Sequence, residues 1–306
     1  MRLYQFGYTR AARQNIAVPI DISSAVRRAV AGHTGVVALE SAVITHGLPA
    51  DAAVEAVNRQ WAACLQAGAV PAVVAVFEGR FRVGISLDDC KVLSRREDAV
   101  KVSPWNLASS LSRPGFGGTT VAATILAATL AGIPVVSTGG IGGVHPGDLA
   151  DVSTDLTELG RNRVVVVCAG PKSTLDREAT LEHLETLGVP VIGWRSDRLA
   201  GFLAESADLP LPARVESVGD LARLLGSHWE LGGHGVVVSQ PLMGEAAIPS
   251  ELLTDGGGVE RGPARTPAEL RRLQQRLGPR MVEANIALLE QNAGLAARLA
   301  VELAKE

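Results

Sequence analysis

The sequence predicts an α/β fold in which helices cover both faces of a parallel sheet. Short apolar runs at residues 36–39 and 164–169 are typical of strands that are buried on both sides. A helix, a glycine, a proline and an apolar strand recur in that order around residues 68–77, 132–138 and 188–194. Proline is tolerated there because the first residue of a strand need not donate a ladder hydrogen bond. This alternation of helix and strand favours α/β over α+β.

Apolar periodicity and capping residues place the individual elements. Asp21 or Ser23 can cap the first helix, and Gly68 can end the second because glycine adopts the left-handed conformation without a Cβ penalty. Ser173 and Asp176 have the spacing of a capping box. The predicted helices span residues 18–31, 50–66, 120–131, 173–187, 215–229 and 280–304, with one more starting at 266–267. The predicted strands are 36–39, 72–77, 135–138, 164–169, 191–194 and 235–239, with a hairpin at 77–84.

Composition places the chain among globular proteins. With 306 residues, of which 47% are hydrophobic, it can bury a sizeable core as one large domain or two. The formal net charge of −3 gives no general attraction to nucleic acid or to an anionic membrane, so an anionic substrate would need local cations. No apolar run is long enough to span a membrane.

The cysteines and the N-terminus favour a cytoplasmic enzyme. Cys64, Cys90 and Cys168 are odd in number and lack metal-ligand spacing, which indicates buried thiols and not a disulfide framework. Residues 1–16 contain arginines but no apolar signal-peptide core. We interpret them as an extension or packing arm, with a poorly supported transit peptide as the alternative.

Two glycine-rich loops predict a ligand site. Residues 139–143 follow one predicted strand and residues 170–172 follow another, and ligands bind at the carboxyl ends of strands in open α/β sheets. The 139–143 loop would let backbone approach a ligand closely. It lacks the spacing of a dinucleotide fingerprint, and a tight turn is the alternative. The polar residues that could share this site are Thr138, His145, Asp151, Ser153, Asp155 and Lys172.

Two ionisable side chains follow buried strands. Glu40 ends one strand, where burial could raise its pKa and make it a proton donor; a capping or salt-bridging glutamate is an equal alternative. Lys172 follows another, where an apolar pocket and a second cation would leave a nucleophilic amine, although a lone loop lysine is usually solvated. Lys101 could be that cation or could hold a phosphate. His145 is more often a hydrogen-bonding loop residue than a ligand.

Two further patterns suit an anion and a metal. Residues 117–120 put backbone N–H groups and threonine hydroxyls at a helix start, which suits an anion, although an ordinary threonine cap is simpler and P-loop spacing is absent. Asp151, Ser153 and Asp155 alternate, so in an extended segment they would point the same way and could serve Mg²⁺ or Mn²⁺. Asp155 could instead cap a short helix at residues 156–159.

Taken together, these segments resemble one family, the pseudouridine-5′-phosphate glycosidases, also called the indigoidine synthase A-like family. The resemblance covers most of residues 36–300, so the set is far more specific than any one motif. The matching segments are VALESAVITHGLP (37–49), KVS (101–103), GGTTVAAT (117–124), STGGIGGVH (137–145), DVSTDLTEL (151–159), VVCAGPKSTLD (166–176), TLEHLETLGVPVIG (180–193) and ANIALLEQNA (284–293).

The resemblance implies a single three-layer α/β/α domain over residues 1–306, with a largely parallel or mixed central sheet, assembled as a homotrimer. It implies reversible cleavage of the C–C glycosidic bond of pseudouridine 5′-phosphate to uracil and ribose 5-phosphate, with a divalent metal, usually Mn²⁺. Lys172 would attack C1′ of the opened sugar, Glu40 would donate the proton, Asp151 would hold the metal and Asn285 would face the base. The residues expected to line the ribose-phosphate site are Lys101, Thr120, Val121, Thr138, His145, Ser153, Thr154 and Asp155.

Three segments depart from the family pattern. PWNL (104–107) replaces RRDL, PGDLA (146–150) replaces RGAE and a longer link, and GPARTPAEL (262–270) replaces GKxxTPFLL. Because the sugar-phosphate and lysine positions stay while these loops change, the aglycone is the part in question. A C-glycosynthase that attaches ribose 5-phosphate to a non-uracil carbon nucleophile in secondary metabolism is the alternative.

Two other classes of function are tested by where the site residues lie. A Schiff-base aldolase or isomerase would share Lys172 but need no base pocket, so it predicts that Glu40 and Asn285 do not face the same cavity as Lys172. A non-catalytic sugar-phosphate-binding protein would tolerate loss of Lys172 or Glu40, and both are present.

Overall fold

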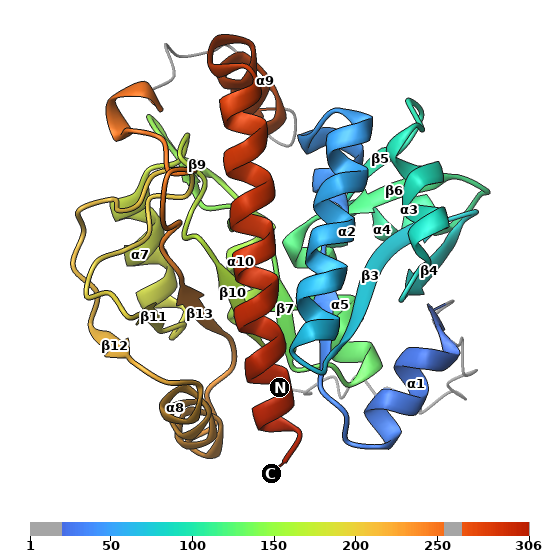
Figure 1. The fold of residues 1–306 in the computed structure, drawn as a ribbon, viewed down its shortest axis with the longest axis horizontal. Coiled ribbons are helices and arrows are strands. Elements are labelled where there is room, and N and C mark those ends of the chain that lie inside the picture. The colour runs from blue at the N-terminus through green and yellow to red at the C-terminus, as the bar shows by residue number, and fades with distance from the viewer. Residues whose placement is uncertain (1–19, 254–264, 306) are drawn as a thin grey trace, which may run out of the picture.

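A mixed sheet runs through the centre of the molecule (Figure 1). The computed structural model describes residues 20–253 and 265–305. In this part of the chain the sheet has 11 strands in the order β1-β4-β3-β2-β7-β10-β13-β11-β12, with β6 on β3 and β5 on β6. The strands are β1 (Ile20–Ile22), β2 (Val36–Leu39), β3 (Val70–Phe77), β4 (Arg80–Val83), β5 (Val100–Val102), β6 (Phe116–Thr119), β7 (Val135–Ser137), β10 (Val165–Cys168), β11 (Val191–Trp194), β12 (Ala213–Val215) and β13 (Val236–Ser239). A separate hairpin pairs β8 (Val144–His145) with β9 (Asp148–Val152).

The middle of the sheet is parallel and one side is mixed. Strands β3, β2, β7, β10, β13, β11 and β12 pair in parallel with their neighbours. On the mixed side β4 and β6 run antiparallel to β3. The β3–β4 hairpin turns through Glu78 and Gly79, both with positive φ. The prediction of a largely parallel or mixed sheet is therefore confirmed.

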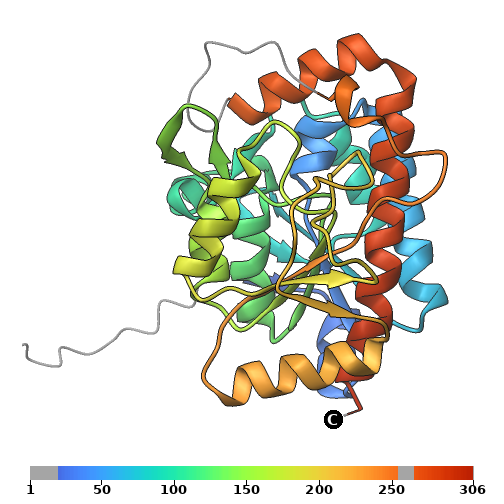
Figure 2. The same ribbon diagram turned by 90° about the vertical axis from the view of Figure 1, so that its left-hand side faces the viewer.

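Helices cover both faces of this sheet and make the three predicted layers (Figure 2). Side chains alternate along a strand, so β2 sends Val37 and Leu39 into one core and Val36 and Ala38 into the other. The first core packs against α2 (Ala50–Gln66), α3 (Leu87–Ser94), α8 (Val218–Glu230) and α10 (Pro279–Leu303). The second packs against α1 (Ser24–Ala31), α4 (Pro104–Leu111), α5 (Val121–Ala131), α6 (Thr154–Leu159) and α7 (Arg177–Thr186).

The long helix α10 runs beside α2 across the first face (Figure 1). It contacts β2, β7 and β10, the strands whose ends carry candidate site residues. Its first half also packs into a third apolar cluster with α9 (Arg265–Leu277) and with residues 242–253, which include the 3₁₀ turn η2 (Ser250–Leu252). This cluster builds one wall of the site described below.

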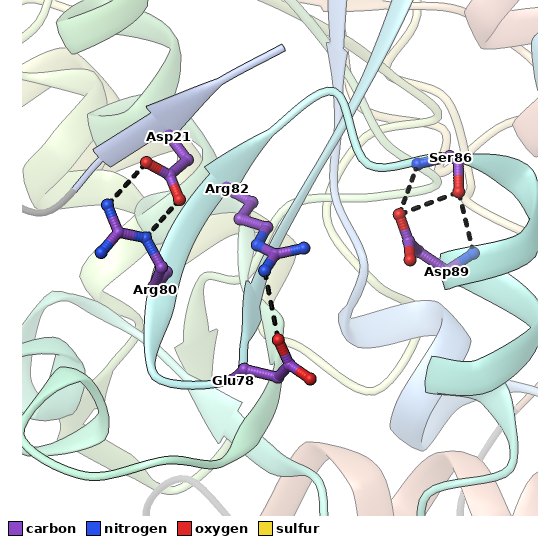
Figure 3. Close-up of polar contacts among 6 residues, drawn as sticks. All are labelled: Asp21, Glu78, Arg80, Arg82, Ser86 and Asp89. Atoms are coloured by element: carbon purple, nitrogen blue, oxygen red, sulfur yellow. Dashed lines mark hydrogen bonds and ion pairs between the residues drawn. The ribbon is translucent and has the colours of Figure 1, made fainter.

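Polar contacts fix the β1–β4 edge of the sheet (Figure 3). Arg80 on β4 forms an ion pair with Asp21 on β1, including a 2.7 Å bond from Nη2 to Oδ1. Beyond β4, Ser86 and Asp89 form a reciprocal capping box at the start of α3.

The structure corrects three local predictions and leaves others outside the described residues. Residues 20–22 form strand β1, so the first helix begins later, with Ser23 as its cap. Helix α7 starts at Arg177 and is capped by Asp176 itself, not by Ser173. The extended segment ends at Val152, because a helix begins at Thr154. The predicted extension 1–16 and residues 254–264 of the glycine-rich 244–266 segment lie outside the described residues. Within the described residues, no helix is both long and apolar enough to cross a membrane.

Candidate active site

A polar cavity of ≈ 280 Å³ lies at the carboxyl ends of the central strands. It gathers ten of the twelve residues predicted from the sequence: Glu40, Lys101, Thr120, Val121, His145, Asp151, Ser153, Thr154, Asp155 and Lys172. They come from six separate stretches of the chain, which meet because carboxyl ends of parallel strands share one edge of the sheet. The glycine loop contributes Gly142 and Gly143 to the wall.

A second, more apolar cavity of ≈ 70 Å³ adjoins the first. The two share Glu40, Ala42, Lys101 and Lys172 in their walls. The remaining lining residues of the second cavity are Val43, His46, Gly47, Gly139, Gly140, Phe202, Met281, Asn285 and Leu289. Asn285, Glu40 and Lys172 therefore face one cavity, as a site with a base pocket requires. The ionisable groups stand at the boundary between a polar and an apolar compartment.

Glu40 is held at this boundary with its carboxyl group out of water. Its side chain follows β2 and is 8% exposed. Oε2 accepts a hydrogen bond from the backbone N–H of Val43 at 3.2 Å, and Oε1 accepts one from the hydroxyl of Thr138 at 3.3 Å. Burial raises the pKa of the Glu40 carboxyl, and the nearby Lys172 charge opposes that rise. A carboxyl group whose pKa is raised keeps its proton to higher pH than an exposed one and can donate it.

The segment after Glu40 is wound as a π-helical turn, η1 (Val43–Gly47). Such turns are rare and occur frequently at functional sites. The turn brings the Val43 N–H back onto the Glu40 carboxylate and sets His46 in the wall of the apolar cavity. No short-range signal in the sequence distinguishes a π turn from a loop, so only the structure reveals it.

Lys172 is positioned by the glycine loop. Its backbone N–H donates to the carbonyl of Ile141 at 3.1 Å, two residues after Gly170, whose φ is +81°. Lys101 on β5 lines the same cavity and is half-buried. Burial and the neighbouring Lys172 charge lower the pKa of Lys101 to about 8. The charge of Lys172 therefore acts on both the Glu40 carboxyl group and the Lys101 amine within one site.

Asp155 joins the two helix starts that border the polar cavity. Its Oδ1 accepts from the N–H of Ala122 at 2.8 Å and its Oδ2 from the N–H of Gly142 at 2.7 Å. Ser153, not Asp155, caps α6, and its hydroxyl accepts from the Asp155 N–H at 3.2 Å. The expected row of Asp151, Ser153 and Asp155 along one strand is wrong, although all three line the cavity.

Thr138 lies behind the cavity instead of on its wall. It is fully buried and reaches the site through its hydrogen bond to Glu40. Asn292 on α10, also buried, supports this point by donating from Nδ2 to the carbonyl oxygens of Thr138 at 2.9 Å and Gly139 at 3.4 Å. The sequence showed Asn285 and Asn292 seven residues apart on one helix face. Only the structure separates their positions, with Asn285 in the cavity wall and Asn292 beneath it.

The apolar cavity holds most of what the sequence missed. Phe202, Met281 and Leu289 line it, yet each is an apolar residue of the kind that fills any core. Their sequence positions are far from Lys172, and no spacing connects them to it. His46 stood within the family-like segment 37–49 but had no assigned place.

The comparisons with known proteins agree with this geometry. The family profile described as "Indigoidine synthase A like protein" matches residues 25–302. The pseudouridine-5′-phosphate glycosidase of Sorangium cellulosum is 41% identical over 299 residues, covering 94% of both chains. That of Nocardioides sp. is 42% identical over 299 residues, covering 93% of this chain and 97% of its own.

Two solved structures share the fold. A crystal structure of an indigoidine synthase A-like protein from Thermotoga maritima superposes with a TM-score of 0.87 at 34% identity, covering 94% of this chain and 97% of the other. The prealnumycin C-glycosynthase AlnA, solved in complex with ribulose 5-phosphate, gives 0.84 at 32% identity with the same coverage. Fold and site thus define an α/β enzyme of the C-glycosidic-bond class. The chain belongs to the indigoidine synthase A-like family.

Proposed function

We propose that this enzyme cleaves, and in the reverse direction forms, the C–C glycosidic bond of pseudouridine 5′-phosphate through an imine on Lys172. One observation supports this above all: Glu40 and Lys172 stand in the wall shared by a polar and an apolar cavity. A C-nucleotide has the same division, with a phosphorylated sugar on one side of the reacting bond and a heterocycle on the other. The relatives from Sorangium cellulosum and Nocardioides sp. bear the same activity in their names.

The polar cavity suits the sugar phosphate. The N-terminus of α5 opens onto it beside Thr120 and Val121, and a helix N-terminus attracts an anion through its backbone N–H groups. Lys101 and Lys172 add cationic charge that offsets the carboxylates. We assign the ribose-phosphate roles of Lys101, Thr120, Val121, His145, Ser153, Thr154 and Asp155 to this cavity. Thr138 supports it from behind through its hydrogen bond to Glu40.

The bond changes follow from the two groups at the boundary. The amine of Lys172 attacks C1′, the C1′–O4′ bond breaks and opens the sugar ring, and the proton that the amine loses goes to O4′. The Glu40 carboxyl group then gives its proton to the base carbon that is bonded to C1′. The C–C bond breaks, its electron pair stays in the base ring, and the Lys172 nitrogen lone pair forms the C=N bond to C1′. Water hydrolyses this imine, which releases ribose 5-phosphate and restores the amine.

We propose that Asp151, in the wall of the polar cavity, holds a divalent cation, expected to be Mn²⁺. Within the described ranges, no three His, Cys, Asp or Glu residues cluster closely enough to hold a metal on their own. Hard divalent cations accept such a site because they keep several waters and take oxygens from the substrate. When bound, the cation would neutralise charge on the substrate oxygens. The homotrimer and the cytoplasmic location stay predictions.

The C-glycosynthase alternative has one supporting observation, the likeness to AlnA. The changed loops, however, border the polar cavity: Trp105 and Ala150 line it, and neither lines the apolar cavity. The departures therefore alter the rim of the sugar-phosphate side, and the reason to doubt uracil becomes weaker. Residues 262–264 of the third changed segment lie outside the described residues.

Borohydride trapping tests the proposal. The protein is incubated with ribose 5-phosphate and sodium borohydride, and the adduct is mapped by mass spectrometry. The chain has only four lysines, so the reduced sugar adduct should appear on Lys172 and not on Lys91, Lys101 or Lys305. Lys172→Ala should lose both the adduct and cleavage of pseudouridine 5′-phosphate, while Lys91→Ala, an exposed-lysine control, should keep both. An adduct elsewhere, or turnover in Lys172→Ala, would rule out the mechanism.

A further inference from the structure

Phe202 has an unusual backbone for an aromatic residue. Its φ is +63°, in the left-handed region that bulky side chains avoid at a cost of about 1–3 kcal/mol. Such a conformation persists only where the surroundings hold it, and these residues cluster at active sites. The side chain is 3% exposed, and its backbone N–H donates to the carbonyl of Ala169 at 2.8 Å. The strain is therefore held by the strand end that leads to Lys172.

Two glycines make room for the Phe202 ring. A Cβ atom on Gly140 would lie 2.6 Å from Cδ2 and 2.7 Å from Cε2 of the ring, closer than real Cβ contacts. A Cβ on Gly139 would lie 3.7 Å from Cε2. One edge of the ring thus packs directly on the glycine backbone. With that edge fixed, the ring has little freedom to turn in the cavity wall.

Backbone hydrogen bonds to one short segment position both Phe202 and Lys172. Ala169 accepts from Phe202 and donates its own N–H to Gly139 at 2.9 Å. Lys172 donates to Ile141, two residues further along the glycine loop. The Phe202 ring and the backbone of Lys172 are consequently placed against one short stretch of chain, residues 139–141. A shift of the ring relative to Lys172 would require these bonds to change.

The rest of the apolar cavity is consistent with a flat heterocycle. Val43, Met281 and Leu289 supply apolar walls, while His46 and Asn285 supply polar groups. This cavity is smaller than the polar one, at ≈ 70 Å³ against ≈ 280 Å³. Aromatic faces stabilise planar rings beyond the area they bury.

From this arrangement we infer that Phe202 is a positioning and specificity residue, whose ring stacks on the aglycone and selects a planar, unsaturated six-membered heterocycle. The inference rests on the proposed function and names its aglycone class. The plane matters because the carbon that takes the Glu40 proton becomes tetrahedral, so the proton must arrive at a face of the ring. As the bond to C1′ breaks, its electron pair restores the double bond in the ring. The ring then becomes planar again against Phe202.

Uracil and 5,6-dihydrouracil provide the test, because they carry the same two carbonyl and two N–H groups but only uracil is flat and unsaturated. Binding of each is measured by calorimetry in a Glu40→Gln background saturated with ribose 5-phosphate, so that uracil binds without being joined to the sugar. With Phe202 in place this protein should prefer uracil, and Phe202→Leu should lose about 2- to 10-fold of that preference. Phe202→Tyr, which keeps the ring, should retain it. Phe81→Leu, the same change at a buried site on β4, should leave the preference unchanged.

The readouts separate this inference from the proposed function. Borohydride trapping of ribose 5-phosphate on Lys172 needs no aglycone, so Phe202→Leu should trap as the wild type does. An unchanged uracil preference in Phe202→Leu, with trapping intact, would overturn the role of Phe202 and leave the function standing. If Phe202→Leu weakened borohydride trapping and the binding of uracil and dihydrouracil to the same extent, the inference would also be overturned, since Phe202 would then have a merely structural role. If Phe202→Leu lost the preference for uracil while the wild-type protein trapped no ribose 5-phosphate, the imine on Lys172 would be overturned and the stacking role of Phe202 would stand.

Discussion

Glu40 can act as an acid because the fold takes its carboxyl group out of water. Burial raises the pKa of this group, so its protonated form persists to higher pH than in an exposed glutamate. Because the reaction needs that proton, turnover should be highest below this raised pKa and fall as pH increases through it. A pH profile of kcat for cleavage of pseudouridine 5′-phosphate measures this descending limb.

Replacing Glu40 tests the assignment of that limb. Glu40→Gln keeps the shape but cannot donate the proton, so kcat should fall by about 10²- to 10⁴-fold. The descending limb should disappear with it, while ribose 5-phosphate should still be trapped on Lys172. Glu55→Gln, an exposed glutamate on α2, should behave as wild type. A Glu40→Gln enzyme that retains the same pH limb would show that another group supplies the proton.

Helix α10 supports the site as an element, and not only through the residue that faces the cavity. Asn292 joins the helix to the carbonyl oxygens of Thr138 and Gly139 in the loop that carries Glu40's hydrogen-bond donor. In Asn292→Leu those buried carbonyl oxygens lose this donor, which should lower the free energy of unfolding by about 1–3 kcal/mol. Urea denaturation measures the change, and cleavage activity should fall as well.

A matched asparagine on a helix surface is the control for this change. Asn58 on α2 is exposed, so Asn58→Leu should alter stability by no more than about 0.5 kcal/mol. If Asn292→Leu were as stable as Asn58→Leu, the link between α10 and the 138–139 loop would contribute little. The activity loss would then need another explanation.

At the scale of the whole molecule, the core encloses all three cysteines. Cys64, Cys90 and Cys168 are each at most 1% exposed, and burial raises the pKa of each thiol to about 12. A thiolate is the reactive form, so a thiol reagent at pH 8 should label none of them in the folded protein. All three should react in denaturant. Rapid stoichiometric labelling of the native protein would contradict this picture of the core.

The predictability of the fold follows from how local its signals are. Helix α2 begins and ends as predicted at Ala50 and Gln66, because its apolar period and the glycine after it are read within one segment. Strand β1 was assigned to a helix, because three residues carry no period and its partner β4 lies some 60 positions away, at Phe81 for Ile20. Likewise, Ser173 and Asp176 have capping-box spacing, yet Asp176 is the cap, because Ser173 still lies in the loop that contains Lys172 and the helix begins only at Arg177.

The sequence by itself determined the α/β class, the strands of the parallel core, the family and ten of the residues around the polar cavity. Those features depend on short-range sequence patterns: apolar runs, glycine caps and motif residues that follow strands. Only the tertiary structure decided that Thr138 supports the site from behind, and that the changed loops border the sugar side. It also supplied the apolar cavity of Phe202, Met281 and Leu289. These features depend on contacts between segments that are distant in the sequence, such as Thr138 with Glu40, 98 positions apart. An apolar residue, moreover, gives no local sign of whether it will face a core or a ligand.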